Sequence, residues 1–262
     1  MIRTLTIVTI ASFFLSVVCV AVAVGLAGPD LILGGMWGWG PWGSHVTWSH
    51  SRSFDGPTET RTLPWKGGET LVVNIPADVT FTQAEGPPKL VVRGPKDALD
   101  SLSLDRSSFL PKRVHQGENW SRSYGDANIS IELTAPKVTT FQTYGPGRLD
   151  IRGYHQDRIR IGAFGSREVS AQGAVRRLDL TINGSDDVDL SGLATDEAAV
   201  TISGSGQAKV APKSWAKLDV SGSGDVTLTT RPKQLESHVS GSGHVEQDLG
   251  NTDDSSGSGE RT

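Results

Sequence analysis

The sequence has only one cysteine, Cys19, in 262 residues, and its formal net charge is only −4. One cysteine cannot form a disulfide within the chain. A charge near zero argues against nucleic-acid binding, which needs a concentrated basic face. We therefore expect a fold without covalent cross-links, and we expect no nucleic acid among its partners.

Several motifs of catalytic and cofactor sites are also missing. No Gly-Lys-Ser or Gly-Lys-Thr follows the glycines, as a phosphate-binding loop would require. No Ser-His-Asp order and no Cys/His cluster stands out. The segment from Gly222 to Asp225 fits part of the calcium-binding nonapeptide repeat, but the half-period from Lys209 to Ala216 lacks that motif. We therefore expect no catalytic residues, no cofactor and no metal site.

Charge is absent from residues 4–29, and the segment from Leu5 to Ala27 is rich in Ile, Val, Leu, Phe and Ala. These 23 residues can cross a hydrocarbon core of about 30 Å as a helix. Arg3 precedes the segment, and the next basic residue is Arg52, which places the N-terminus in the cytoplasm.

Residues 1–28 are therefore predicted to be a transmembrane anchor, with the lipid bilayer as the partner of residues 5–27. The predicted location is the inner membrane, with a single pass and the C-terminal domain in the periplasm. The alternative is a cleaved signal with a mature N-terminus near Gly28, which would release a periplasmic or secreted protein.

Glycine is abundant, and one short glycine phrase returns at a fixed interval. Its first glycines occur at positions 145, 165, 184, 204, 222 and 241, so the spacings are 20, 19, 20, 18 and 19 residues. A period of this size is typical of stacked repeats. The later copies read Ser-Gly-Ser-Gly. Glycine permits positive φ, and Ser or Asn beside it favours a tight corner.

The residues that flank each turn alternate between apolar and polar, which predicts short strands that bury one face. The fold class is therefore all-β, a single-stranded parallel β-helix or solenoid with rungs of about 18–20 residues, preceded by one transmembrane helix. The residues expected to point inside are Ile161, Leu180, Ile182, Val200, Ile202, Leu218, Val220, Val226, Leu228 and Val239.

Stacking of the rungs should align the turns in a ladder. The predicted structural turn ladder consists of Gly145, Gly165, Asn183, Gly184, Ser203, Gly204, Ser221, Gly222, Ser240 and Gly241. A ladder of turn residues keeps the corners in register, and the alternative is a row of ligand-binding groups. Ser and Gly are turn residues for purely local reasons, which favours the structural role.

The rest of the chain divides around this repeat. We expect residues 29–59 to form a Gly/Trp-rich linker, residues 60–248 the solenoid domain, and residues 249–262 a disordered tail, because the chain from Asn251 on lacks apolar residues and cannot bury a core. Strands are also expected before the repeat, with one helix candidate from Pro95 to Leu104 and an insertion at 111–124.

The order of these segments resembles that of a known family. The segments are Leu71–Ile75, Phe81–Gln83, Lys89–Gly94 and Ile131–Pro136, followed by the repeated Ser-Gly-Ser-Gly turns. Over about residues 60–248 the chain resembles the putative auto-transporter adhesin family with a head GIN domain, a bacterial domain of unknown function. The resemblance implies an exported β-helical protein and supplies no catalytic residues. The insertion at 111–124 and Pro146 in the first turn depart from the family pattern.

Three functional hypotheses follow. The first is a non-enzymatic binding or adhesion module of the cell envelope, with an envelope glycan or a protein surface as partner. The second is a polysaccharide-acting enzyme, because parallel β-helices host such enzymes and a glycosidase needs two carboxylates. The third is a structural envelope protein. Candidate carboxylates for the second are Asp179, Asp187, Asp189, Asp219 and Asp225. The oligomeric state does not follow from the sequence.

Overall fold

The computed structural model describes residue 54 and residues 56–66, 68–111 and 127–249. All of them lie in one compact unit, Ser51–Thr262. About 74% of the structure is strand, arranged as a β-solenoid of about four turns. The expected all-β solenoid is therefore confirmed.

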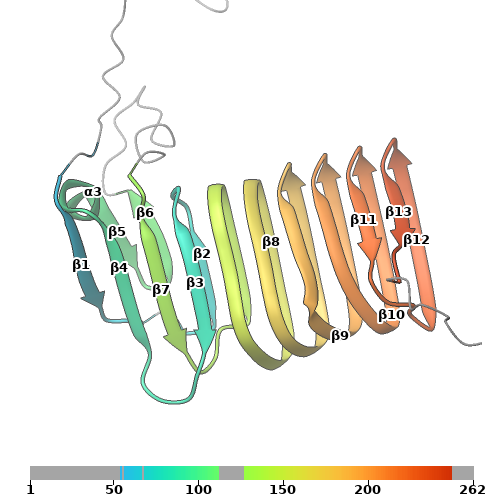
Figure 1. Ribbon diagram of the computed structural model, residues 1–262, viewed down its shortest axis with the longest axis horizontal. Coiled ribbons are helices and arrows are strands. Elements are labelled where there is room, and N and C mark those ends of the chain that lie inside the picture. The colour runs from blue at the N-terminus through green and yellow to red at the C-terminus, as the bar shows by residue number, and fades with distance from the viewer. Residues whose placement is uncertain (1–53, 55, 67, 112–126, 250–262) are drawn as a thin grey trace, which may run out of the picture. The chain divides into compact units, whose positions relative to one another are not determined.

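The solenoid is formed by the second half of the chain, in which the strands wind as a continuous coil (Figure 1). Its strands are β8 (Thr140–Gly184), β9 (Asp187–Gly204), β10 (Gln207–Gly222), β11 (Asp225–Leu228), β12 (Gln234–Gly241) and β13 (His244–Gln247). β9 pairs in parallel with β8 and β10, and β10 pairs in parallel with β11 and β12. The parallel arrangement expected from the repeat is thus present here.

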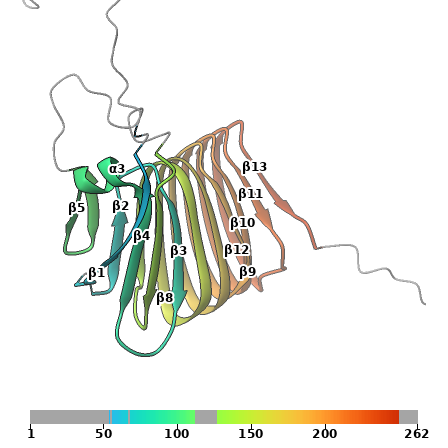
Figure 2. The same ribbon diagram turned by 60° about the vertical axis from the view of Figure 1, so that its left-hand side comes forward.

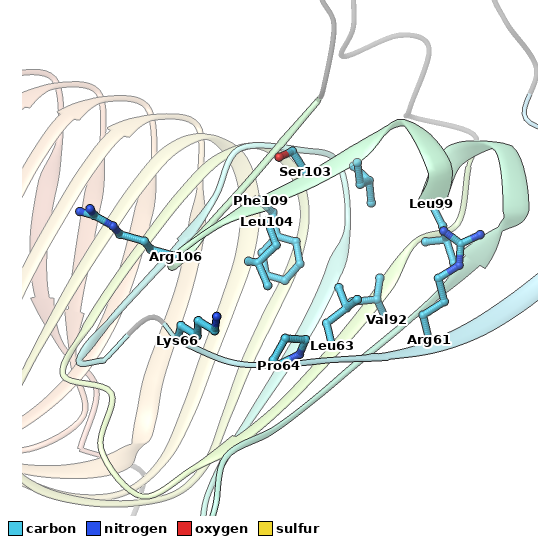
Figure 3. Close-up of a pocket in the computed structure, with 11 residues that line it drawn as sticks. Arg61, Leu63, Pro64, Lys66, Val92, Leu99, Ser103, Leu104, Arg106 and Phe109 are labelled. Atoms are coloured by element: carbon cyan, nitrogen blue, oxygen red, sulfur yellow. The ribbon is translucent and has the colours of Figure 1, made fainter.

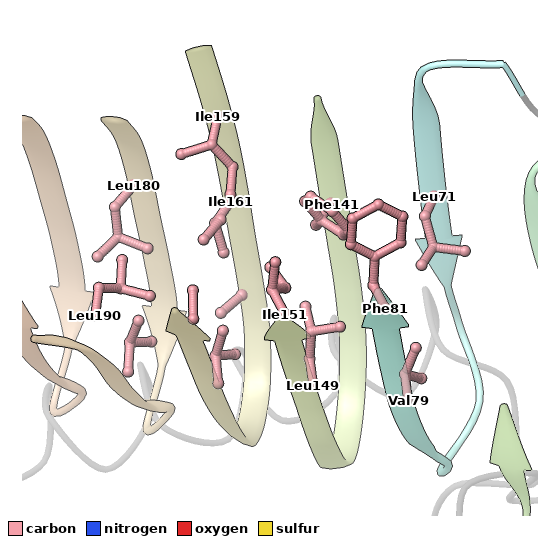
Figure 4. Packing of buried hydrophobic residues seen from close by; sticks show 14 of the residues in the cluster. Leu71, Val79, Phe81, Phe141, Leu149, Ile151, Ile159, Ile161, Leu180 and Leu190 are labelled. Atoms are coloured by element: carbon pink, nitrogen blue, oxygen red, sulfur yellow. The ribbon is translucent and has the colours of Figure 1, made fainter. Parts of the chain in front are cut away.

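The register of these strands stacks like side chains into columns. Ile182 is aligned with Ile202, Ile202 with Val220, and Val220 with Val239. Successive side chains of a strand point to opposite faces, so the period-two pattern sends each such column inward. Nine of the ten residues expected inside are at most 2% exposed. Figure 4 shows part of this interior, including Ile161, Leu180 and Leu190.

Val239 is the exception, since its side chain is 38% exposed. It continues the inward column, but among the described strands β12 pairs only with β10. No further described rung covers the end of the column, so the apolar side chain stays open to solvent. The expectation that Val239 is buried is therefore wrong, because alternation fixes the direction of a side chain and not what covers it.

A matched pair of substitutions in this column measures how much the burial of each valine contributes to stability. Val220→Ala should lower the free energy of unfolding by about 2 kcal/mol, because it removes two fully buried methyl groups and leaves a cavity. In the single chain, Val239→Ala should cost well under about 1 kcal/mol, because its methyl groups are already partly hydrated. Urea unfolding followed by circular dichroism checks both values. Equal costs would show that Val239 is covered in solution.

The first turn of the coil comes from an earlier part of the chain. β2 (Thr70–Val73) and β3 (Asp78–Gln83) pair in parallel with the first two segments of β8, at residues 140–143 and 149–152. β7 (Ser130–Ala135) lies on the other side of β3, also in parallel. The insertion at 111–124 therefore lies, in the sequence, between β3 and β7, which are neighbours in the sheet.

The N-terminal end of the sheet is antiparallel, which corrects the prediction of a purely parallel fold. β4 (Lys89–Pro95) pairs antiparallel with β7 and with β1 (Thr58–Leu63). Only five residues, 84–88, join β3 to β4. A connection this short reverses the chain, whereas a parallel crossover needs about a dozen residues or more.

A short helix and a hairpin complete this end of the molecule, where Figure 2 shows α3, β5 and β1 together. α3 (Lys96–Ser101) lies within the expected helix from Pro95 to Leu104 and ends earlier, because β5 (Leu102–Asp105) follows at once. β5 pairs antiparallel with β6 (Ser108–Pro111). Arg106 in the turn between them has a φ of 52°, the left-handed conformation of a tight hairpin turn.

Aromatic side chains fill the wider first turns of the coil. The Phe81 and Phe141 rings meet edge to face at 5.1 Å (Figure 4). The ring of Tyr154 lies 6.3 Å from that of Phe141. The Tyr154 hydroxyl is within hydrogen-bond distance of the carbonyl oxygens of Val138, at 3.1 Å, and Arg158, at 2.9 Å. Burial raises the pKa of Tyr154 well above its ordinary value, because the phenolate would lose its hydration.

The raised pKa of Tyr154 predicts a pH effect at high pH. The neutral phenol is favoured in the folded state, so its contribution is complete below about pH 10 and is lost as the pH rises. Burial lowers the pKa of Arg167 to about 10, which gives the opposite slope in the same range. The informative quantity is therefore the stability difference between the wild type and Tyr154→Phe. We expect it to fall by about 1.4 kcal/mol per pH unit above pH 10. A difference independent of pH would contradict the burial of the hydroxyl.

Several expectations concern residues outside the described part of the chain. These are the membrane span at 5–27, the linker tryptophans, most of the insertion at 111–124 and the tail from residue 250. Within the described residues, no helix is long and apolar enough to cross a membrane.

Candidate functional site

The predicted turn ladder lies along one corner of the solenoid. Asn183 is aligned with Ser203, Ser203 with Ser221, and Ser221 with Ser240. All four side chains are exposed. The six glycines of the ladder, from Gly145 to Gly241, all have positive φ, between 78° and 154°.

The stacked glycines of the ladder are in close backbone contact. A Cβ atom on Gly184 would lie 2.4 Å from the oxygen of Gly165, and one on Gly204 would lie 2.4 Å from the oxygen of Gly184. A Cβ on Gly165 would lie 2.9 Å from the nitrogen of Gly145. These positions therefore need glycine for space as well as for backbone conformation.

Two buried charged residues occupy the position two residues after the first glycine. Later turns have Gly206, Gly224 or Gly243 there, but two earlier turns have Arg167 and Asp186. Both side chains are 1% exposed. The sequence analysis missed them, although the departure from Gly-Ser-Gly at these two turns was a visible signal.

Arg167 binds the backbone of the turns that precede it. Its guanidinium donates to the carbonyl oxygens of Ala77 at 2.6 Å, Pro146 at 2.8 Å and Ile75 at 3.0 Å, with longer contacts to two further carbonyls. Its Nε atom is buried without a partner among the described atoms. The guanidinium thus holds two irregular turns together from inside the coil.

Asp186 makes the corresponding contacts one turn later. Its carboxylate accepts hydrogen bonds from the backbone N–H groups of Gly165, at 3.0 Å, and Arg167, at 2.7 Å. Burial raises its pKa, and these hydrogen bonds and the Arg167 charge act against that rise. Because the carboxylate is enclosed and bonded to backbone, it is placed as a structural acceptor and not where a substrate can reach it.

The five carboxylates considered for an enzyme lie on the outer side of the strands. Asp179 accepts from Arg177 Nε at 3.2 Å, and Asp189 accepts from the N–H and hydroxyl of Ser191, at 2.9 and 2.6 Å. These Ser191 hydrogen bonds lower the pKa of Asp189. A general acid needs a raised pKa instead, so Asp189 is set up as an acceptor. Among the described residues, no group of three His, Cys, Asp or Glu side chains could hold a metal ion.

A concavity with apolar walls lies at the other end of the described sheet, between β1, α3 and the β5–β6 hairpin (Figure 3). Its volume is about 380 Å³, which is in the range of small-molecule sites. Its apolar wall is formed by Leu63, Val92, Leu99, Leu102, Leu104 and Phe109. We call this concavity the cap pocket. No residue that lines it was identified as a site from the sequence, because its walls come from five elements, β1, β4, α3, β5 and β6, that meet only in the fold.

Three cations border the cap pocket, and they are not equivalent. Arg61 is bonded to Glu59 and to Asp100, each at 2.7 Å, and these hydrogen bonds raise its pKa. Lys66 and Arg106 are exposed, and neither forms an ion pair with any described residue. The pocket therefore combines apolar walls with two cations, Lys66 and Arg106, that can bind an anionic group.

Residues 121–232 match the model of a family described as putative auto-transporter adhesin, head GIN domain. This segment is similar to the head GIN domain of that family, and we call it the head GIN segment. The family resemblance drawn from the sequence is thus confirmed, over a shorter range than the expected 60–248. The head GIN segment contains the predicted turns at Gly145 to Gly222 and both buried charges. The cap pocket and the last turn at Gly241 lie outside it.

One solved structure shares the fold at low sequence identity. A putative adhesin from Bacteroides fragilis has a TM-score of 0.54 and 15% identity, with 73% of this chain and 97% of that chain covered. A putative lipid binding protein from Parabacteroides distasonis has a TM-score of 0.46 and 17% identity, with coverage of 74% and 98%. The first of these likenesses shows a common fold and nothing further. The comparison with curated proteins finds no match.

Proposed function

We propose that this protein is a non-enzymatic binding or adhesion module of the bacterial cell envelope, and that its cap pocket holds an amphipathic anion. The ligand class is an acyl-type chain with a carboxylate or phosphate group, as found at envelope surfaces. The head GIN segment and the fold shared with a putative adhesin support the adhesive role. The single observation that carries the ligand class is the apolar cap pocket with cations at its rim.

The apolar part of the ligand fits the wall of the cap pocket. Leu63 and Leu104 are only partly buried, while Val92 and Phe109 behind them are at most 2% exposed. Covering the partly exposed leucines would remove apolar surface from water, which is worth about 25 cal/mol per Å². In Figure 3, Leu104 and Phe109 of the hairpin stand on one side of the pocket and Leu63 and Val92 on the other.

The charged part of the ligand is selected by Lys66 and Arg106. Arg61 already has two carboxylates as partners, so its charge is largely compensated. The other two cations have no such partner among the described residues, so an incoming carboxylate or phosphate would form charge-assisted hydrogen bonds with them. A cationic amphiphile of the same chain length would gain the apolar contact and suffer repulsion at the rim.

Calorimetric titration of the full-length protein tests this proposal. We expect dodecanoate to bind and dodecyltrimethylammonium to bind at least about tenfold more weakly, at concentrations below those at which either forms micelles. The double variant Lys66→Glu with Arg106→Glu should weaken dodecanoate binding by about tenfold or more. The matched control is Lys209→Glu with Lys233→Glu, which makes the same charge change on the distant solenoid and should leave binding unchanged.

Two results would overturn the proposed ligand class. One is equal binding of the anionic and cationic amphiphiles, and the other is an equal loss of binding in the pocket variant and its control. Leu104→Gln tests the apolar part separately, and it should weaken the binding of both amphiphiles. Failure of all three tests would remove the cap pocket from the binding function.

The proposed envelope location depends on the N-terminal segment. The apolar run at 5–27 supports a single inner-membrane span with the folded domain in the periplasm, and the alternative is a cleaved signal. Intact mass of the protein recovered from membranes separates the two. A chain that starts at Met1 and resists carbonate extraction supports the span. A mature N-terminus near Gly28 would contradict it.

A further inference from the structure

The last strand of the solenoid has an unpaired edge. Among the described strands, β12 pairs only with β10, and β13 pairs only with β11. All eight residues of β12 are exposed. A regular strand with a free row of N–H and C=O groups is a template for pairing with another strand. At the right-hand end of Figure 1, β12 and β13 close the stack.

Apolar side chains continue along this edge from the interior. Leu235 is 41% exposed and Val239 is 38% exposed, and both are aligned with buried residues of β10, Ala216 and Val220. The chain after residue 249 reads Asn-Thr-Asp-Asp-Ser-Ser-Gly-Ser-Gly-Glu-Arg-Thr, preceded by a glycine, and it has no apolar side chain to cover them. An occupant that stabilises this edge would place apolar side chains against Leu235 and Val239.

The two ends of the solenoid differ, which limits how copies of the chain can meet. At the other end, β4 pairs antiparallel with β7, the last strand of the parallel stack, and with β1, and α3 lies against β4. The outermost strand there, β1, is partly exposed and carries Arg61 with its two acidic partners. Stacking of one copy's last turn on another copy's first turn would need two parallel-solenoid ends, and the chain has one. A contact between the last turns of two copies instead uses the same exposed apolar edge on both copies.

The sequence of β12 is complementary to itself in one antiparallel register. When Ser237 faces Ser237 of a second copy, each residue faces the residue equally far beyond the centre. Leu235 then faces Val239 on the inner side of the strand, and Glu236 faces His238 on the outer side. Apolar pairs and an acid opposite a histidine both stabilise an antiparallel pair. Glu236 is 3.2 Å from Lys217 of its own chain, so its carboxylate already lies over the outer face.

We propose that two copies of this protein associate through the β12 edge, antiparallel and centred on Ser237. The pairing joins the two solenoids end to end in a two-fold dimer and covers Leu235 and Val239 on both copies. A closed two-fold contact uses the same patch on each subunit and stops at two copies. The proposal is independent of the ligand in the cap pocket, which lies at the opposite end of the described sheet.

Cysteine cross-linking of the full-length chain tests the register. In a Cys19→Ala background, Ser237→Cys places two thiols opposite each other on the two-fold axis, at a separation that a disulfide can bridge. Ser240→Cys is the matched control, because in this register Ser240 faces Gln234 and not itself. We expect at least about tenfold more disulfide-linked dimer for Ser237→Cys on non-reducing gels. Equal yields at the two positions, or none at Ser237→Cys, would overturn the proposed pairing.

Sedimentation in a mild detergent tests the same contact without a cross-link. Val239→Lys puts two cations into the apolar part of the edge and should weaken dimerisation by at least about tenfold. Thr201→Lys adds the same charge on an exposed outer face in the middle of the stack and should have no effect. A monomeric wild type at all accessible concentrations would overturn the proposal, as would equal effects of the two substitutions.

Discussion

Arg167→Met is expected to lower the free energy of unfolding by about 3–5 kcal/mol. The guanidinium donates to the carbonyl oxygens of Ala77, Pro146 and Ile75 within 3.0 Å, and methionine of similar length offers no donor. Each buried carbonyl left without a partner costs about 1–3 kcal/mol. The loss exceeds a typical surface effect because the three carbonyls belong to two separate turns, both of which would have to move to find new donors.

The desolvation of Arg167 acts in the opposite direction. Burial lowers its pKa to about 10, so the folded protein carries a cost for keeping this cation charged, and methionine would remove that cost. Urea unfolding of Arg167→Met measures the balance. The control is Arg148→Met, because Arg148 is exposed and forms its ion pair with Glu168 on the surface. The urea midpoint of this variant should equal that of the wild type. Equal midpoints for both variants would mean that desolvation cancels the hydrogen bonds.

Gly204→Ala is expected to destabilise the solenoid by about 3–5 kcal/mol, for two separate reasons. Gly204 has a φ of 126°, a conformation that residues with a side chain rarely adopt. The new Cβ would also lie 2.4 Å from the oxygen of Gly184, which is backbone and cannot rotate away. Because Gly204 stacks between Gly184 and Gly222, the displacement would spread to both neighbouring turns.

Gly86→Ala separates the two reasons. Gly86 has a φ of 110° but no atom within 4 Å of the position of its Cβ. It should therefore show the backbone strain alone, about 1–3 kcal/mol, and the difference from Gly204→Ala measures the steric contact. Circular dichroism during urea unfolding gives both values. If the two variants were equally stable, the ladder would not be tightly stacked in solution, and its structural role would be lost.

The turn ladder and the buried charges together explain how the solenoid keeps its register. In the later turns, glycine at both positions lets the backbones approach, and no side chain is needed inside the corner. In the earlier turns, Arg167 and Asp186 replace the second glycine and bind backbone groups of the preceding turn. Pro146, which departs from the family pattern, belongs to the turn that Arg167 stabilises. Polar contacts therefore stabilise the solenoid at the turns that depart from the Gly-Ser-Gly pattern.

Much of the solenoid could be predicted from the sequence because its contacts repeat locally. A rung of about 19 residues meets the next rung through the same few positions, so spacing and alternation alone identified the turn glycines and nine of the ten inward residues. The strands β2, β3, β4 and β7 were predicted in the same way, because each is a short run rich in apolar residues between turn residues. The helix candidate at 95–104 contains α3.

The features that could not be predicted from the sequence depend on contacts between distant parts of the chain. The antiparallel end depends on how β4 returns beside β7, about 40 residues later in the chain. The cap pocket exists because β1, α3 and the hairpin meet. Arg167 contacts Ala77 across 90 residues, and no local pattern distinguishes such an arginine from one in a solvated turn. Val239 shows the same limit, since alternation directs a side chain inward and only the next rung can bury it. Local periodicity therefore determined the coil, whereas its two ends and its buried charges were set by the tertiary structure, because they depend on which neighbours are present.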